Sequence, residues 1–246
     1  GKEKEILLQY ECFPGIQNVN FSIEEGEVFA IMGLSGSGKS TLLRCLNRLI
    51  DVSTGHVLIE GQNIGIMKPK EIKELRQKKI SMVFQHFALF PHRKVLDNAA
   101  FGLEIQGVPK NKRYEMARDM LEMVGLNGYE NYYPEELSGG MQQRVGLARA
   151  LLVHSEILLM DEPFSALDPV IRQQMSDEFI KLVSLLKKTI VFITHDMAEA
   201  LKVASRIAVM KDGRILQIGT PEEIVLHPKD AFVEKFVQSA FSILKI

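Results

Sequence analysis

Long apolar runs and cysteine are scarce in this sequence of 246 residues. No apolar run approaches the roughly 18 residues of a membrane-spanning helix, so we expect any membrane span to come from another chain. The chain has only two cysteines, Cys12 and Cys45, and no secretory h-region at its start, which favours a reducing, cytosolic location. We therefore expect both thiols to act as small apolar side chains.

An excess of either charge is also missing, because 30 basic residues nearly balance 31 acidic ones. The charge balance does not provide the electrostatic attraction of a nucleic-acid-binding protein, so we expect no nucleic-acid partner. With 46% hydrophobic and 25% charged residues, the composition is that of a globular protein and excludes a disordered or collagenous chain. Residues 68–79 are a local exception, with six basic and two acidic side chains. They are typical of the solvated face of a helix, and contact with anionic lipid headgroups or a partner is the alternative.

Several short apolar runs are continuous rather than alternating, as in strands that are buried on both faces. These runs cover residues 28–32, 80–84, 157–160, 190–193 and 207–210. Segments with helical spacing lie between them; one of these carries Ile171, Met175, Phe179 and Leu182, with Asp168 as N-cap and Pro169 at the first helical position. The pattern predicts an α/β fold with a mainly parallel sheet.

One long segment interrupts this alternation. From about residue 87 to 154 we find no buried strand, while Met116, Met120 and Leu121 have helical spacing and Gly125 is a stop signal. We interpret residues 87–155 as a helical subdomain inserted in an α/β core of residues 1–86 and 156–246. The whole chain, 1–246, then forms a single domain.

The two ends of the chain carry further patterns. Residues 6–10, 16–23 and 56–60 alternate beside glycine-rich turns, which predicts an N-terminal antiparallel β layer. From residue 231 onward Phe232, Phe236, Ala240 and Leu244 are spaced as one helical face. That helix either docks on its own domain or continues beyond it.

The strongest single signal is a glycine-rich segment that fits G-x-x-x-x-G-K-[ST], with a strand before it and a helix after it. Glycines let backbone N–H groups surround phosphate oxygens, and the helix directs its positive end at them. The lysine adds a point charge and the serine offers a magnesium ligand. The predicted nucleotide-binding residues here are Gly33, Leu34, Ser35, Gly36, Ser37, Gly38, Lys39, Ser40 and Thr41.

A magnesium–nucleotide site needs a second oxygen ligand from a neighbouring strand, and Asp161 ends the apolar run 157–160. The next residue, Glu162, is placed to polarise a water that attacks the γ-phosphate.

A second anion site is predicted at Ser138, Gly139 and Gly140, which open a helix. One nucleotide rarely needs two such sites from one chain, so we predict an ATP-dependent homodimer in which each Ser138 loop covers the nucleotide of the other subunit.

With these residues, the chain resembles the nucleotide-binding subunit of an ABC transporter, a P-loop NTPase with a RecA-like core. Residues 33–40 match Walker A of that family, 137–141 its signature, 157–162 its Walker B, 165–168 its D-loop and 194–196 its switch histidine motif, all in the family's order. Met141 departs from the usual glutamine, and we expect activity to survive this change.

The resemblance implies ATP and Mg²⁺ as ligands and assigns a role to each matching residue. Glu162, His195 and Gln85 would be catalytic, and Ser40, Gln85 and Asp161 would bind the metal. Asp168 would contact nucleotide, although its position as an N-cap explains it equally well. Tyr10 would stack on adenine, with Phe13 as the alternative.

Phe87, Leu89 and Phe90 follow Gln85, where the family accepts a segment of a transmembrane permease. Packing in the core is the alternative for these side chains. Residues 42–50 and 78–84 are similar to the cassettes of bacterial glycine betaine, choline and carnitine importers. Many of those importers continue into regulatory CBS domains. This sequence could therefore be either a truncated chain or a naturally short form.

The implied function is ATP hydrolysis that powers uptake of a small solute. The subfamily resemblance implies that this solute is a quaternary amine osmoprotectant. The subunit would be peripheral, on the cytoplasmic face of the inner membrane, and would act indirectly with an extracytoplasmic solute-binding protein. The alternatives are an importer ATPase for another solute, a soluble ABC-type ATPase acting on DNA or the ribosome, and a P-loop phosphotransferase. The last lacks any recognisable acceptor-binding element, and the sequence has no sustained heptads for a long coiled coil.

Overall fold

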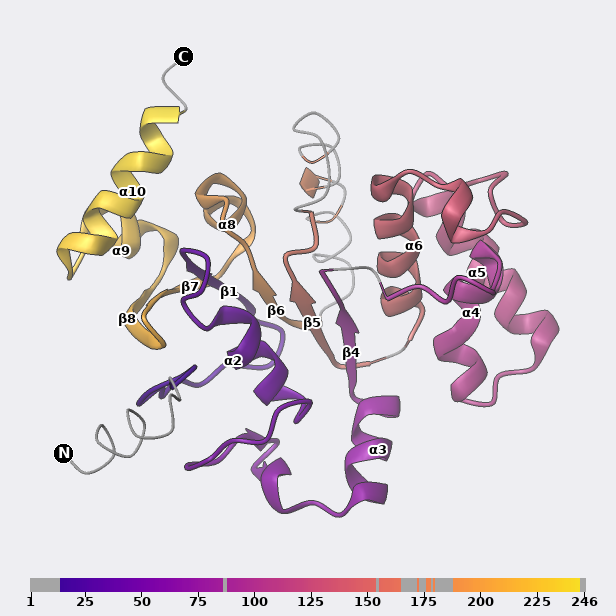
Figure 1. Cartoon of the computed structure of the whole chain (residues 1–246), viewed down its shortest axis with the longest axis horizontal. Helices are drawn as coiled ribbons and strands as arrows, with labels where there is room; N and C mark the ends of the chain where they lie inside the picture. Colours follow the sequence, from indigo (N-terminus) through magenta and orange to yellow (C-terminus); the bar gives the residue numbers. More distant parts are fainter. Residues whose placement is uncertain are drawn as a thin grey trace.

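A computed structural model describes residues 14–85, 88–153, 155–164, 172, 176–177, 179 and 188–243. Its centre is a six-stranded sheet in the order β4-β5-β6-β1-β7-β8 (Figure 1). Four neighbouring pairs are parallel and the edge pair β7–β8 is antiparallel, which confirms the mainly parallel sheet. The strands are β1 (Val28–Gly33), β4 (Ile80–Val83), β5 (Ile157–Asp161), β6 (Thr189–Ile193), β7 (Arg206–Lys211) and β8 (Arg214–Gly219).

Both faces of the sheet are buried, which explains why the strand sequences are continuously apolar. Along β1, Phe29 and Ile31 join one hydrophobic cluster, with Leu43 of α2 (Lys39–Leu46). The alternate residues Ala30 and Met32 join a second cluster on the other face.

That second face is covered by α8 (Met197–Val203) and α10 (Ala231–Ile243), among others. Val233 and Val237 are buried in its cluster, and Phe232 and Phe236 pack partly against it. This part of α10 is therefore docked on its own domain, one of the two predicted alternatives.

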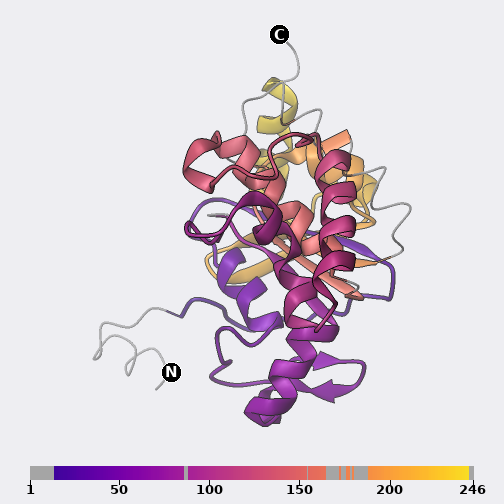
Figure 2. The same cartoon turned by 90° about the vertical axis from the view of Figure 1, so that its right-hand side faces the viewer.

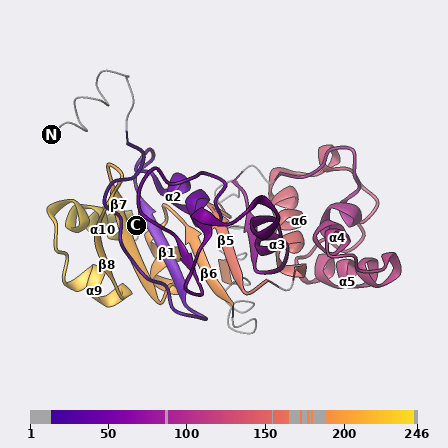
Figure 3. The ribbon, with the colours of Figure 1, turned by 90° about the horizontal axis from the view of Figure 1, so that it is seen from below.

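A separate group of helices lies at the opposite end of the molecule from α10 (Figures 1 and 3). It comprises α4 (Val95–Ile105), α5 (Lys110–Met123), η2 (Pro134–Glu136) and α6 (Gly139–Leu152). Figure 2 views the molecule from this helical side. The helices share a hydrophobic cluster of their own, and α5 ends just before Gly125, which has a φ of +70°. No strand is assigned within the described residues from 88 to 153, although the division of the chain at residues 87 and 155 stays a prediction.

The predicted N-terminal β layer is only partly present. A two-stranded hairpin, β2 (Leu58–Ile59) with β3 (Gln62–Asn63), falls at the predicted segment 56–60. The prediction of a strand at residues 16–23 was wrong, because these residues form no strand in the structure. The alternation there reflects apolar side chains, such as Ile16 and Phe21, that pack on the core from an extended segment without a strand ladder. The segment 6–10 lies outside the described residues.

The remaining elements are η1 (Ile64–Ile66), α3 (Pro69–Lys78) and α9 (Pro221–Leu226). In α3, Arg76 donates hydrogen bonds to the carbonyl oxygens of Asn47 and Arg48, so part of the basic segment 68–79 is used within the fold. Across the residues that the structure describes, no helix has both the length and the apolar character needed to cross a membrane.

Candidate functional site

The predicted site residues come from distant parts of the chain and meet at one edge of the sheet. Gly33 ends β1, Asp161 ends β5, and Gln85 and His195 follow β4 and β6 closely. These four strands are parallel, so their carboxyl ends lie together, which is where ligands bind in open α/β sheets.

The loop from β1 to α2 depends on glycine at two positions. A Cβ atom at Gly33 would lie 2.2 Å from the carbonyl oxygen of Met210, and one at Gly38 would lie 2.4 Å from that of Gly15. Both glycines also have positive φ, +152° and +96°, which other residues rarely adopt. The loop thus packs its backbone directly against neighbouring backbone, which requires residues without side chains.

Lys39 is buried beneath this loop. Its Nζ atom donates hydrogen bonds to the carbonyl oxygens of Gly33 and Leu34, both at 3.0 Å. Burial lowers the pKa of Lys39, while the carboxylates of Glu162 and Asp161 oppose that shift. The Lys39 amine thus lies at the base of the loop, close to both carboxylates.

Two observations indicate that the loop fits a phosphate group. The Oγ atom of Ser37 is buried and has no hydrogen-bond partner in the structure, which is uncommon for a buried polar atom. The N-cap residue of α2, Gly38, provides no side-chain cap, so the first N–H groups of the helix lack the acceptor that a cap supplies. A phosphate oxygen supplies acceptors for both kinds of donor.

Ser40 and Asp161 present the oxygen atoms expected of a Mg²⁺ site. The Ser40 hydroxyl donates to Asp161 Oδ1 at 2.8 Å, and Asp161 is completely buried. Arg44 Nη2 lies 3.4 Å from Asp161 Oδ2. A hydroxyl and a carboxylate side by side suit Mg²⁺, which prefers oxygen ligands and takes its other ligands from water and phosphate.

Glu162 follows Asp161 and lies close to Gln85 and His195. Its Oε2 atom lies 3.4 Å from Gln85 Nε2 and 3.7 Å from His195 Nδ1. Its φ of +49° is unusual for a residue other than glycine, and strained backbone of this kind clusters at functional sites. The structure thus brings the three predicted catalytic residues together, and the predicted metal contact of Gln85 stays a prediction.

Ser138 is the N-cap of α6, and its hydroxyl accepts a hydrogen bond from the Met141 N–H at 3.3 Å. Ser138 and Gly139 are exposed, whereas the Met141 side chain packs partly against the cluster of the helical group. The departure at Met141 is therefore accommodated by packing. In Figures 1 and 3, α6 and α2 lie on opposite sides of β5, so the two predicted anion sites of one chain are separate.

Some predicted residues cannot be placed. Tyr10 and its alternative Phe13, the segment 165–168 with Asp168, and Phe87 lie outside the described residues. Leu89 packs partly against the helical cluster, and the Phe90 ring centroid lies 4.5 Å from that of Phe101. Leu89 and Phe90 thus make packing contacts within the chain, as the alternative interpretation predicted.

Sequence reasoning missed Glu199, which lines a small cavity together with Glu162 and His195. Glu199 is buried, and the Thr194 hydroxyl donates a hydrogen bond to its Oε2 atom. Burial raises the pKa of Glu199 to about 7. The spacing Asp196-x-x-Glu199 is the only signal in the sequence, and it predicts a helix start rather than a buried acid.

Comparisons with known proteins agree with this geometry. The sequence model of the ABC transporter family matches residues 16–165. The glycine betaine transport ATP-binding protein OpuAA of Bacillus subtilis (strain 168) is 56% identical over 236 residues, which cover 96% of this chain and 56% of that protein. The glycine betaine/carnitine transport ATP-binding protein GbuA of Listeria monocytogenes serotype 1/2a (strain 10403S) is 52% identical over 239 residues, 97% of this chain and 60% of that protein. The chain thus spans less than two thirds of the length of these relatives.

A solved structure shows the same fold. The dimeric, post-hydrolysis state of the ATP-binding cassette MJ0796, bound to ADP and Pi, has a TM-score of 0.80 and 35% sequence identity, covering 85% of this chain and 91% of that one. This likeness confirms the predicted α/β P-loop fold class.

Proposed function

The chain belongs to the ABC transporter family, and on that premise we propose that it is the ATP-binding and ATP-hydrolysing subunit of an importer. One observation carries the proposal: Lys39, Ser40, Asp161 and Glu162 converge where the strands end, beside a loop that fits phosphate. ATP is the substrate, and ADP and inorganic phosphate are the products.

The chain's own residues would bind the nucleotide. The backbone N–H groups at the start of α2 and the buried hydroxyl of Ser37 would donate to phosphate oxygens, with Lys39 adding its charge. Ser40 and Asp161 would hold Mg²⁺, which, when bound, neutralises charge on the β- and γ-phosphates.

Hydrolysis needs a water molecule aligned with the γ-phosphorus atom. The Glu162 carboxylate would orient this water and accept its proton while the oxygen–phosphorus bond forms and the bond to the bridging oxygen of ADP breaks. Gln85 and His195, which flank the Glu162 carboxylate, would keep it in the orientation for attack.

The transported solute would be a quaternary amine osmoprotectant such as glycine betaine, carnitine or choline. OpuAA is named for glycine betaine transport, and GbuA for glycine betaine and carnitine transport. A further relative, OpuBA of Bacillus subtilis (strain 168), is a choline transport ATP-binding protein. Transmembrane permease subunits would contact the segment with Phe87, Leu89 and Phe90, and a solute-binding protein would act outside the membrane. The chain would work on the cytoplasmic face of the membrane as a homodimer.

Glu162→Gln tests this function. We expect the variant to bind ATP normally but to lose at least about 100-fold in hydrolysis, because the amide cannot accept the water's proton. In cells stripped of other osmolyte systems, uptake of labelled glycine betaine, choline and carnitine under osmotic stress should be lost as well. The matched control is Glu122→Gln, an exposed position in α5.

Two results would contradict parts of the proposal. Hydrolysis that survives in Glu162→Gln would remove Glu162 from its assigned role. Equal uptake with wild-type and variant protein, despite lost hydrolysis, would leave the ATPase in place and remove the quaternary amine as cargo. The solute would then be a different one.

A further inference from the structure

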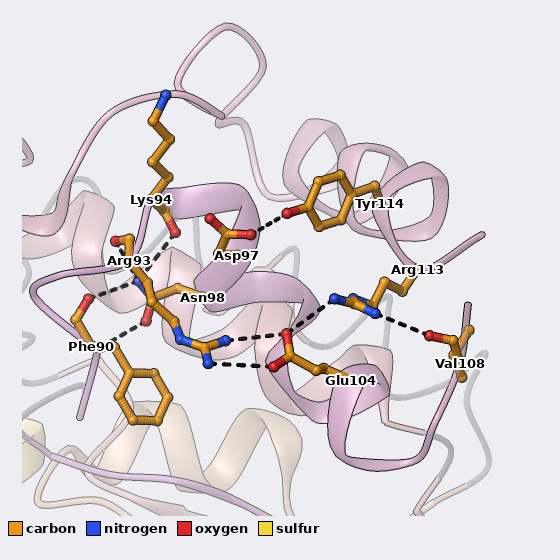
Figure 4. A network of polar contacts seen from close by, with 9 residues as sticks. All are labelled: Phe90, Arg93, Lys94, Asp97, Asn98, Glu104, Val108, Arg113 and Tyr114. Atoms are coloured by element: carbon orange, nitrogen blue, oxygen red, sulfur yellow. Dashed lines mark hydrogen bonds and ion pairs between the residues drawn. The ribbon is translucent and has the colours of Figure 1, made fainter. Parts of the chain in front are cut away.

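A buried amide in α4 contributes to holding the segment 88–94, which follows Gln85 in the sequence. Asn98 is completely buried in the first turns of α4. Its Oδ1 atom accepts a hydrogen bond from the Phe90 N–H at 2.8 Å, and its Nδ2 atom lies 3.1 Å, 2.9 Å and 3.2 Å from the carbonyl oxygens of Phe90, Arg93 and Lys94 (Figure 4). One side chain thus satisfies backbone groups along most of the segment.

An asparagine is well suited to this position. Its amide offers one acceptor and two donor hydrogens on adjacent atoms, which matches an N–H group and a set of carbonyl oxygens. A carboxylate would face those carbonyl oxygens without donors, and an alanine would leave the partly buried Phe90 N–H group without this acceptor. Both changes would leave polar groups unpaired, which weakens the attachment of the segment.

Other side chains hold the same segment. Arg93 forms an ion pair with Glu104 at 3.2 Å, and Glu104 also pairs with Arg113 at 3.2 Å (Figure 4). At the start of the segment, Arg149 of α6 donates to the carbonyl oxygen of Ala88 at 2.8 Å. Segment 88–94 is therefore tied to both α4 and α6.

These helices connect the segment to the second predicted anion site. Side chains of α4, including Val95, Ala99 and Leu103, share a buried cluster with Val145 and Leu152 of α6. The N-terminus of α6 carries Ser138 as its N-cap. At its other end, the segment follows Gln85, which contacts Glu162.

We propose that Asn98 is a positioning residue that holds segment 88–94 rigidly on α4. When a bound permease moves this segment, α4 and α6 would move with it, and the movement would reach Ser138 at one end and Gln85 at the other. The inference rests on the proposed importer function, because the permease is the partner that moves the segment. The Asn98 side chain is completely buried and bonds backbone groups of the segment. Its loss should separate ATP hydrolysis from transport.

The test compares wild type, Asn98→Ala and Asn98→Asp in the full transporter reconstituted in vesicles with its permease and solute-binding protein. We expect solute uptake per ATP hydrolysed to fall at least about tenfold in both variants, and the Phe90 amide to exchange hydrogen faster. Asn131→Ala is the matched control, because Asn131 is exposed and accepts from Lys94 of the same segment at 3.4 Å. It should keep the wild-type ratio.

The design separates instability from uncoupling. Should the Asn98 variants fail to fold, Arg93→Ala decides, because it releases the segment from Glu104 without emptying a buried site; its uptake per ATP should fall as well. Folded Asn98 variants that keep the wild-type ratio of uptake to ATP hydrolysis would overturn the proposed role of Asn98, and so would Arg93→Ala if the Asn98 variants do not fold. Neither result would affect the proposed importer function. A wild-type complex that hydrolyses ATP without transporting any solute would overturn the importer function and this inference with it.

Discussion

At the scale of single residues, Glu199 is a buried acid beside the predicted catalytic residues. Its buried carboxyl group shares a cavity with Glu162, His195 and Arg172. Burial raises its pKa to about 7, the neighbouring Asp196 and Glu162 add to that increase, and the Thr194 hydrogen bond and Arg172 oppose it. The folded protein therefore binds a proton at this residue over a pH range in which the unfolded chain has lost it.

This difference predicts a dependence of stability on pH. Because the folded-state pKa lies above the usual value of 4.5, Glu199 favours folding most below pH 4.5, and this contribution is lost as the pH rises through about 7. Glu199→Gln, which stays neutral, should gain stability relative to wild type between pH 5 and pH 8.5, by up to about 3 kcal/mol. Thermal unfolding of both proteins across this range measures the gain. The control Glu115→Gln, at an exposed position, should show the same pH dependence of stability as wild type. If the stability difference between Glu199→Gln and wild type does not change with pH, Glu199 is ionised over the whole range.

At the scale of elements, the docked part of α10 buries two valines one turn apart. Val233 is completely buried and Val237 nearly so, in the cluster that also contains Ala200 of α8. Lys211 of β7 lies 4.9 Å from the centroid of the Phe232 ring, which adds a cation–π contact to the docked face.

Val233→Ala tests whether this docking stabilises the protein. The substitution removes two buried methyl groups and leaves a cavity, so we expect the free energy of unfolding to fall by about 2 kcal/mol in urea titrations. Lys235→Ala, at an exposed position of the same helix, should change it by less than about 0.5 kcal/mol. Equal stability of the two variants would mean that α10 contributes no packing to the core.

The central strands were predictable because their burial on both faces leaves continuous apolar runs. The edge strand β8 was not predicted, since Arg214 and Gln217 interrupt its apolar pattern. Gln217 is nonetheless buried, because the carbonyl oxygen of His227 and the N–H of Lys229 satisfy its amide. A buried polar residue of this kind depends on a partner ten or more residues away, which no local pattern reveals.

The same distinction applies to the site. Lys39, Ser40 and Asp161 were predictable because phosphate and metal binding need particular residue types at fixed spacing. Asn98 and Glu199 were missed because their importance arises from burial and from backbone groups elsewhere in the fold. Sequence patterns therefore identified the residues that would meet the ligand but not the buried polar residues Asn98 and Glu199.

At the scale of the whole molecule, the two predicted anion sites are separated within one chain. The phosphate loop lies at the carboxyl end of β1, whereas Ser138 begins a helix of the group beyond β4 and β5. Ser138 and Gly139 are exposed, so they are accessible to a second molecule. The related cassette MJ0796 was solved as a dimer with ADP and Pi. A two-fold pair of chains would give each nucleotide both kinds of site.

This arrangement predicts how nucleotide controls assembly. Glu162→Gln should form a dimer at saturating Mg-ATP, because ATP binds and is not consumed, and should dissociate when ATP is removed; light scattering at high protein concentration measures the mass. Adding Ser138→Arg should prevent the dimer, because a long side chain fills the turn that would cover the phosphate, although ATP binding to each separate chain should persist. Glu135→Arg, an exposed position in η2, introduces the same side chain nearby and should leave the dimer intact. A dimer that survives Ser138→Arg would mean that the chains associate through another surface. The Ser138 loop would then need a different ligand.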